Sequence, residues 1–204
     1  MAVVDTETTG VDPEVHEIYQ FTMVPLDSFL NRRTDILPLD LWIKPNRPEC
    51  VEETKIQGHK KRVQHACLHG FDSIRAADLL AEYIETLKLP YTPTGTRKRI
   101  IPLGHNYGFD LSFIIPWLGK AAYNDIFSVL YRDTMSTALF LNDQRDFNNE
   151  KPFCAKVNLT YLATHLGIEH GTLHDSLEDC LVTAEVFKRM CQTMVIGQQR
   201  EVTA

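Results

Sequence analysis

The apolar run that opens the chain ends in two carboxylates, and this feature constrains the fold most. Val3 and Val4 lead directly into Asp5 and Glu7, and Gly10 then marks a turn. A short apolar run bounded by a turn predicts a buried strand, on which residues two apart leave the same face. Adjacent carboxylates resist ionisation unless a cation compensates them, and Mg²⁺ prefers oxygen ligands of this kind. By itself the pattern leaves a metal site and a solvent-facing strand edge as equal alternatives.

Further apolar patterns predict strands in the first part of the chain and alternating strands and helices after them. We expect strands over residues 18–26, 39–43, 99–103 and 125–132, and helices over 73–87, 109–118, 134–141, 158–166 and 176–194. Segment 51–70 is polar and is expected to be irregular, and segment 142–156 is expected to be a polar connection. This order is typical of an α/β fold in which helices cover both faces of a mixed sheet.

The helix expected over 73–87 has the clearest amphipathic pattern of the chain. Its buried face is predicted to consist of Ile74, Ala77, Leu80, Ala81 and Ile84. No repeat, low-complexity segment or linker divides the sequence, and 204 residues suit one α/β domain. We therefore predict a single domain over residues 1–195 and a short C-terminal tail over residues 196–204.

Cysteine usage and apolar segments indicate the compartment. The five cysteines contain no CxxC pair and are odd in number, so reduced thiols in a cytoplasmic protein are expected rather than a disulfide framework. The longest apolar stretch, residues 111–118, contains Pro116 and is far too short to cross a bilayer, so no membrane partner is expected. A signal peptide is not expected either, because Asp5 and Glu7 interrupt the first residues.

The charge balance bears on a nucleic-acid partner. The formal net charge of −6 is unlike that of most nucleic-acid-binding proteins, which are basic. Bound divalent cations would offset part of this charge. Two short basic runs, residues 60–62 and 97–99, are candidates to flank a strand-binding groove, although short runs are more often solvated loops. Charge alone therefore predicts weak, non-processive binding.

Two later clusters carry further candidate catalytic groups. Asp110 follows an apolar strand pattern and lies near the start of the helix expected over 109–118. His174 and Asp179 flank the start of the last helix, where a histidine suits a general base and a carboxylate suits a metal. Each cluster alone is equally explained by the helix dipole, which favours acidic residues at helix N-termini. Only their combination with the first strand is informative.

Together the three clusters resemble the three exonuclease motifs of the DnaQ-like superfamily. Residues 3–10 are similar to its first motif, His105–Asn106 with Phe109–Asp110 to its second, and His174 with Asp179 to its third. The histidine in the third motif is typical of the DEDDh branch, and the chain resembles the proofreading epsilon-type exonuclease of DNA polymerase III. The resemblance covers most of residues 2–190. It implies an RNase H-like fold with a mixed five-stranded sheet flanked by helices.

The resemblance also implies roles for five catalytic residues. Asp5 would bridge two Mg²⁺ ions, for which Mn²⁺ can substitute. Glu7 and Asp179 would hold the ion that activates water, Asp110 would support the other ion, and His174 would take a proton from the attacking water. Two such ions clamp a scissile phosphate and stabilise the attacking and leaving oxygens.

Six further residues would contact the terminal nucleotide by the same resemblance: Thr8, Thr9, Gln57, His105, Asn106 and Phe109. Stacking on an aromatic ring such as that of Phe109 is tolerant of sequence, so little sequence preference is expected. Two departures concern substrate handling. Gln57 replaces a histidine, and Gln20 stands where relatives usually have a glutamate.

The expected activity is removal of nucleoside 5′-monophosphates from the 3′ end of DNA, single-stranded or frayed, in proofreading or repair. A 3′–5′ exoribonuclease of the RNase T or oligoribonuclease type is the nearest alternative. A non-catalytic module that binds a DNA polymerase is an alternative of another class, but it predicts loss of a metal ligand. A DNA polymerase is also a possible partner of an active exonuclease.

A group of three histidines and one cysteine near residue 60 suggests a second metal site. Its members are His59, His65, Cys67 and His69. Their spacing matches no common structural zinc pattern, so a polar loop beside the substrate groove is the better interpretation.

Overall fold

A mixed sheet forms the centre of the molecule. The structure is a computed structural model that describes residues 1–52, 58–171 and 175–201, with side chains as far as residue 193. Within these residues the five strands are β1 (Ala2–Thr8), β2 (Ile18–Pro25), β3 (Leu39–Trp42), β4 (Pro102–Gly104) and β5 (Arg132–Asp133). They lie in the order β3-β2-β1-β4-β5. β1 is antiparallel to β2 and parallel to β4, so the central strand has a neighbour of each kind.

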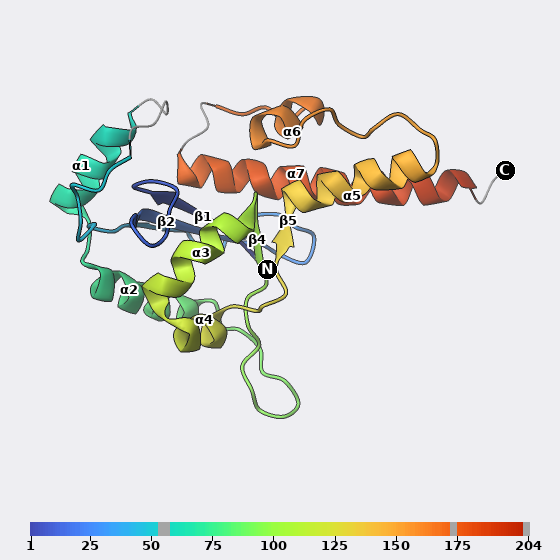
Figure 1. The fold of residues 1–204 in the computed structure, drawn as a ribbon. Coiled ribbons are helices and arrows are strands. Elements are labelled where there is room, and N and C mark those ends of the chain that lie inside the picture. Colours follow the sequence, from blue (N-terminus) through green and yellow to red (C-terminus); the bar gives the residue numbers. More distant parts are fainter. Residues whose placement is uncertain (53–57, 172–174, 202–204) are drawn as a thin grey trace.

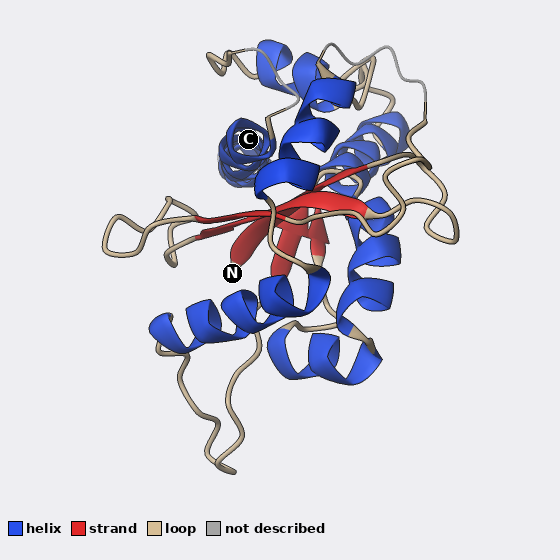
Figure 2. Ribbon diagram, turned by 90° about the vertical axis from the view of Figure 1, so that its left-hand side faces the viewer, coloured by secondary structure: helices blue, strands red, loops and turns tan. Residues whose placement is uncertain are grey.

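Helices cover both faces of this sheet. They are α1 (His59–His69), α2 (Ser73–Thr86), α3 (Tyr107–Leu118), α4 (Lys120–Ile126), α5 (Thr134–Phe147), α6 (Leu159–His165) and α7 (Ser176–Glu201). α7 packs along β1 and β2 on one face, with α5 and α6 against it. α2, α3 and α4 cover the other face, and Figure 2 shows the sheet between the two helical layers. None of the helices in the described ranges is long and apolar enough to span a bilayer.

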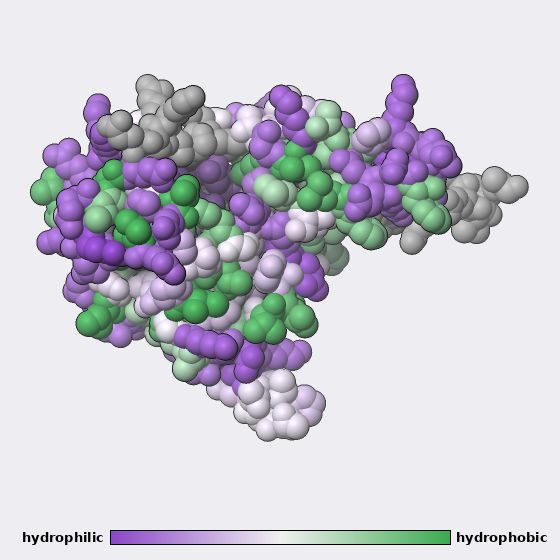
Figure 3. All heavy atoms as spheres, viewed as in Figure 1, coloured by the Kyte–Doolittle hydropathy of each residue, from purple (hydrophilic) through white to green (hydrophobic). Residues whose placement is uncertain are grey.

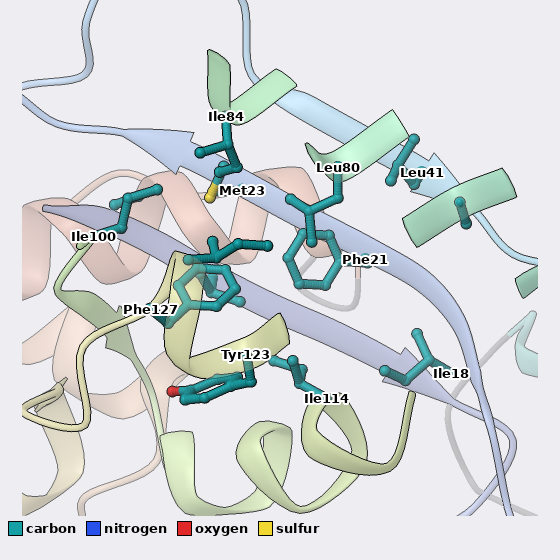
Figure 4. Close-up of a cluster of buried hydrophobic side chains, with 14 of the residues drawn as sticks. Ile18, Phe21, Met23, Leu41, Leu80, Ile84, Ile100, Ile114, Tyr123 and Phe127 are labelled. Carbon is teal, nitrogen blue, oxygen red and sulfur yellow. The ribbon is translucent and has the colours of Figure 1, made fainter. Parts of the chain in front are cut away.

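The larger hydrophobic core lies between the sheet and α2–α4. Figure 4 shows Phe21 and Met23 of β2 facing Leu80 and Ile84 of α2, with Phe127 beside them. Burial of these side chains is the main favourable term that holds the layers together. A second cluster on the other face joins β1, β2 and β4 to α7. The two cores clamp β1 from both sides.

Most predicted elements are confirmed. The strands expected over 18–26 and 39–43 are β2 and β3, and the strand expected over 99–103 is β4. Three helices begin where they are expected, and each follows a side-chain cap: Asp72 before α2, Asp133 before α5 and Asn158 before α6. Each cap accepts hydrogen bonds from backbone N–H groups that a helix start otherwise leaves unpaired.

Two predicted segments are wrong. The segment expected to be irregular, 51–70, contains the helix α1, whose buried residues are His59, Val63 and Ala66. This narrow apolar stripe lies among lysines, arginine and histidines, so the sequence pattern is weak. The strand expected over 125–132 is instead the end of α4 followed by a two-residue strand. Tyr123 and Ile126 both pack into the core although they are three residues apart, which one face of a helix allows and a regular strand does not.

Three helices differ in detail from the prediction. α5 extends to Phe147, into the segment expected to be a connection. α7 continues past residue 195 to Glu201, so one helix crosses the predicted domain boundary. In α2 the buried residues are Ala76, Leu80 and Ile84, whereas Ile74 is 77% exposed. The buried face of α2 is therefore rotated about the helix axis relative to the predicted one, so that Ala76 is buried and Ala81 is exposed.

We predict that two apolar positions of α2 respond differently to truncation. Leu80→Ala is expected to lower the free energy of unfolding by about 2–5 kcal/mol, because Leu80 is fully buried. Ile74→Ala is the matched control in the same helix and is expected to change it by less than about 0.5 kcal/mol. Urea denaturation followed by circular dichroism measures both values. Equal losses would contradict the observed face of α2.

Candidate active site

Three carboxylates meet at the carboxyl end of β1. Asp5 and Glu7 leave the same face of the strand, and the first turn of α7 brings Asp179 beside them. One oxygen from each of the three lies within 4.8 Å of the others. The start of α7 is held in place by Ser176, whose hydroxyl donates to the backbone oxygen of Asp5 at 3.3 Å. Asp175 caps the helix by accepting from the backbone N–H of Leu177.

Asp110 approaches the same strand from the opposite face. It lies in the first turn of α3 and is only 4% exposed. Its Oδ1 accepts from the backbone N–H of Thr6 at 2.8 Å and from the Thr6 hydroxyl at 2.7 Å. Thr6 points away from Asp5 and Glu7 because successive residues of a strand face opposite sides. Four carboxylates from β1, α3 and α7 therefore surround the end of one strand.

The electrostatics of this group indicate uncompensated negative charge. Burial raises the pKa of Asp5 well above its usual value, and the charges of Asp110 and Asp179 raise it further. Burial raises the pKa of Glu7 to about 7, against the opposing effect of the Arg62 guanidinium. Burial also raises the pKa of Asp110 to about 7, although the hydrogen bonds from Thr6 act in the other direction. Closely placed oxygen ligands with this charge fit a hard divalent cation.

Comparisons with known proteins agree with this geometry. No family model matches the chain. It is 28% identical over 192 residues to the PolC-type DNA polymerase III of Thermotoga petrophila, a match that covers 94% of this chain and 12% of that protein. Exonuclease I from Methylocaldum szegediense superposes with a TM-score of 0.62 at 23% identity, over 94% of this chain and 40% of the other. For Escherichia coli exonuclease I, described as a zinc-bound complex with single-stranded DNA, the TM-score is 0.67 at 20% identity, with the same coverage.

The chain has the fold of exonuclease I. The predicted resemblance to the DnaQ-like superfamily is thereby confirmed, and so is the RNase H-like class with its mixed five-stranded sheet. The chain spans well under half the length of each of these relatives, so similarity is established for one part of each larger protein.

Two of the predicted substrate residues lie at the end of β1 and in the turn that follows it. The Thr8 hydroxyl donates to the backbone oxygen of Gly10 at 2.7 Å. The backbone N–H of Thr9 donates to the oxygen of Glu17 at 2.8 Å, and its hydroxyl accepts from the Glu17 N–H at 3.0 Å. Both threonines are buried and hold the β1–β2 turn beside Glu7. Their contact with a nucleotide stays a prediction.

Three more predicted substrate residues surround the start of α3. His105 is half-buried, its Nδ1 lies 2.8 Å from the Thr134 hydroxyl, and burial lowers its pKa. Asn106 is exposed and adopts the left-handed conformation, with φ 61°. Phe109 is half-buried, with its ring centroid 5.1 Å from that of Phe113. Their roles also stay predictions, and Gln57 and His174 lie outside the described residues.

The alternative zinc site near residue 60 has no support in the described part of the chain. The carboxylates Asp5, Glu7 and Asp179 form the metal-capable group found there, and His59, His65, Cys67 and His69 form none. His65 packs its ring on Trp42, with centroids 4.7 Å apart, and His59 is buried in α1. Gln20, the departure at the second strand, donates to Asp40 at 2.8 Å instead of joining the carboxylates.

Sequence reasoning missed two residues next to Glu7. The Tyr19 hydroxyl donates to Glu7 Oε2 at 3.0 Å, and Arg62 Nε donates to the Tyr19 hydroxyl at 3.2 Å. Arg62 belongs to the basic run 60–62, which the sequence suggested only as a groove flank. Strand alternation gave no signal for Tyr19, because its position in β2 depends on a local shift of register between β1 and β2.

We predict that charge repulsion in this site destabilises the metal-free protein as the pH rises. Carboxyl groups with raised pKa values keep protons in the folded state that the unfolded chain releases between about pH 4 and 7. Stability is therefore lost over this window. Asp5→Asn removes one charge, so in EDTA its melting temperature should exceed that of the unsubstituted protein at pH 8, and the difference should shrink at pH 5. Differential scanning fluorimetry measures both.

Mg²⁺ provides the complementary measurement. It should raise the melting temperature of the unsubstituted protein at pH 8 and have little effect on Asp5→Asn, because a ligand stabilises only the state that binds it. If Asp5→Asn were less stable than the unsubstituted protein in EDTA at pH 8, repulsion would not be the dominant interaction in the site.

Proposed function

We propose that the chain is a Mg²⁺-dependent 3′–5′ exonuclease that hydrolyses single-stranded DNA from its 3′ end and releases nucleoside 5′-monophosphates. The observation that carries this proposal is the group of Asp5, Glu7 and Asp179, with ligand oxygens within 4.8 Å, and Asp110 on the other side of the same strand. The DnaQ-like fold supports it, because the likeness to exonuclease I covers the strands and helices that position these residues.

The carboxylates divide the work of holding cations. Asp5 would contribute to both ions, because its oxygen lies within 4.8 Å of those of Glu7 and Asp179 and the charge of Asp110 also raises its pKa. When bound, the two divalent cations supply Lewis-acid polarisation of the phosphate and a water of lowered pKa. Mg²⁺ suits these oxygen ligands, and Mn²⁺ can replace it. The protein contributes a preformed site, because Ser176 and Thr6 fix the segments that carry the ligands.

His174 is the proposed general base. It precedes the α7 cap Asp175 by one position in the sequence and lies outside the described residues. A histidine changes protonation near neutral pH and is therefore suited to take the proton from an attacking water. That His174 lies close enough to the carboxylates to reach this water is part of the proposal.

DNA is the proposed substrate for two reasons. PolC is a DNA polymerase, and the E. coli exonuclease I structure is described as a complex with single-stranded DNA. On this chain, the partly exposed ring of Phe109 can stack on a base. The exposed Lys60 and Lys61 of α1 can attract the phosphate backbone, and Figure 3 shows hydrophilic residues over this part of the surface.

The four metal-ligand carboxylates are all present, which supports an enzyme over a non-catalytic polymerase-binding module. Sequence similarity to PolC supports proofreading or repair as the setting and a polymerase as a partner.

We predict a descending ladder of products from 5′-labelled DNA in the presence of Mg²⁺ and none in EDTA. Asp5→Asn and Asp110→Asn should each lower the rate by more than about 10²-fold, because a metal site contributes several kcal/mol to transition-state stabilisation. Asp78→Asn, an exposed aspartate of α2, is the matched control and should leave the rate unchanged. Time-resolved gel electrophoresis gives the rates.

The same assay with RNA of matched sequence tests the substrate. Faster loss of RNA than of DNA would reassign the chain to RNA processing while retaining the chemistry. No ladder from either strand would contradict the proposed activity of the isolated chain.

A further inference from the structure

The register of β2 changes next to the active site. Glu7 pairs with Gln20, but Thr8 pairs with Ile18, so one residue of β1 corresponds to two residues of β2. Tyr19 is the extra residue. Such β-bulges re-aim side chains and occur frequently beside active sites.

The core confirms what this shift does to the side chains. Ile18 and Phe21 both belong to the cluster under α2 and α3, as Figure 4 shows, although residues three apart in a regular strand face opposite sides. Without the extra residue, Tyr19 would share the side of Phe21. With it, Tyr19 lies on the side of Glu7 and packs against Val63 and Ala66 of α1.

The re-aimed Tyr19 connects Glu7 to α1. Its side chain is completely buried, and its hydroxyl donates to Glu7 Oε2 at 3.0 Å. The same hydroxyl accepts from Arg62 Nε at 3.2 Å. Arg62 lies in the first turn of α1, where its backbone N–H donates to the oxygen of Gly58 at 3.0 Å. A chain of hydrogen bonds therefore runs from the Arg62 guanidinium on α1 through the Tyr19 hydroxyl to one oxygen of the Glu7 carboxylate.

We propose that Tyr19 and Arg62 are positioning residues for the metal ligand Glu7: together they set the orientation of its carboxylate and so raise the affinity of the site for a divalent cation. Outer groups that hydrogen-bond to metal ligands typically contribute 10–100-fold to metal affinity or activity. The inference rests on the proposed function, because it takes Glu7 as a ligand. It adds that α1, which begins directly after the segment containing Gln57, is mechanically linked to the metal site.

The first test measures Mn²⁺ binding to the DNA-free protein. Electron paramagnetic resonance of the free ion gives the affinity. Tyr19→Phe keeps the buried ring and removes only the hydroxyl, and it should weaken Mn²⁺ binding by about 10–100-fold. Tyr83→Phe is the matched control. Tyr83 belongs to α2, away from the site, and its hydroxyl donates a hydrogen bond to the backbone oxygen of Leu37. It should bind Mn²⁺ as the unsubstituted protein does.

Circular dichroism and melting temperature establish that each variant is folded. A folded Tyr19→Phe protein with Mn²⁺ affinity within twofold of the unsubstituted protein would overturn the inference. In the exonuclease assay, Tyr19→Phe should raise the Mg²⁺ concentration needed for half-maximal rate and leave the KM for DNA unchanged at saturating Mg²⁺.

The second test asks whether Arg62 acts through Tyr19. Arg62→Lys keeps the charge and loses the fixed geometry of Nε, so it should also weaken Mn²⁺ binding. Combined with Tyr19→Phe, it should add no further loss, because groups that act as one unit are not additive. Additive losses would show that Arg62 acts independently of the hydroxyl and would overturn the link to α1.

Failure of the proposed function has a different signature. Equal Mn²⁺ binding by the unsubstituted protein and Asp5→Asn would contradict the proposed metal site, whatever the effect of Tyr19→Phe. If the unsubstituted protein binds Mn²⁺ specifically and digests DNA but Tyr19→Phe has no effect, only the positioning role of Tyr19 and Arg62 is contradicted.

Discussion

Mutual repulsion of carboxylates at the end of β1 is the constraint on which the rest of the structure depends. Asp5, Glu7 and Asp110 lie in one region with Asp179, and burial and neighbouring charge oppose the ionisation of the first three. Hydrophobic packing on both faces of the sheet holds the segments that carry them. The fold thus uses apolar burial to maintain an arrangement of charge that is unfavourable until a cation binds.

The sequence predicted the parts of the fold that local rules determine. Asp133 and Asn158 cap helices through contacts within three residues, and the apolar run before Asp5 forms the buried strand β1. It failed where tertiary packing decides. Val63 and Ala66 of α1 are buried against Tyr19 of β2, and Tyr123 and Ile126 of α4 pack into the core on one face of a helix.

The same division applies to the site. Asp5 and Glu7 were accessible to strand alternation, and Asp110 and Asp179 to their places at helix starts. Their convergence could be inferred only from the resemblance to a family, because no local rule brings residues 104 positions apart into contact. The hydrogen bonds of Tyr19 and Arg62 had no such pattern to reveal them, since a shift of register breaks the alternation on which prediction relies.

That shift of register also limits how the chain can change in length. Adding or removing one residue between Ile18 and Phe21 would exchange the two sides of the start of β2, sending an apolar side chain toward the carboxylates and a phenol into the core. The turn at residues 11–16 lies outside the ladder and can lengthen or shorten without this penalty. In an alignment of related chains, gaps therefore belong in the turn, and the eight positions of β2 form a block without insertions.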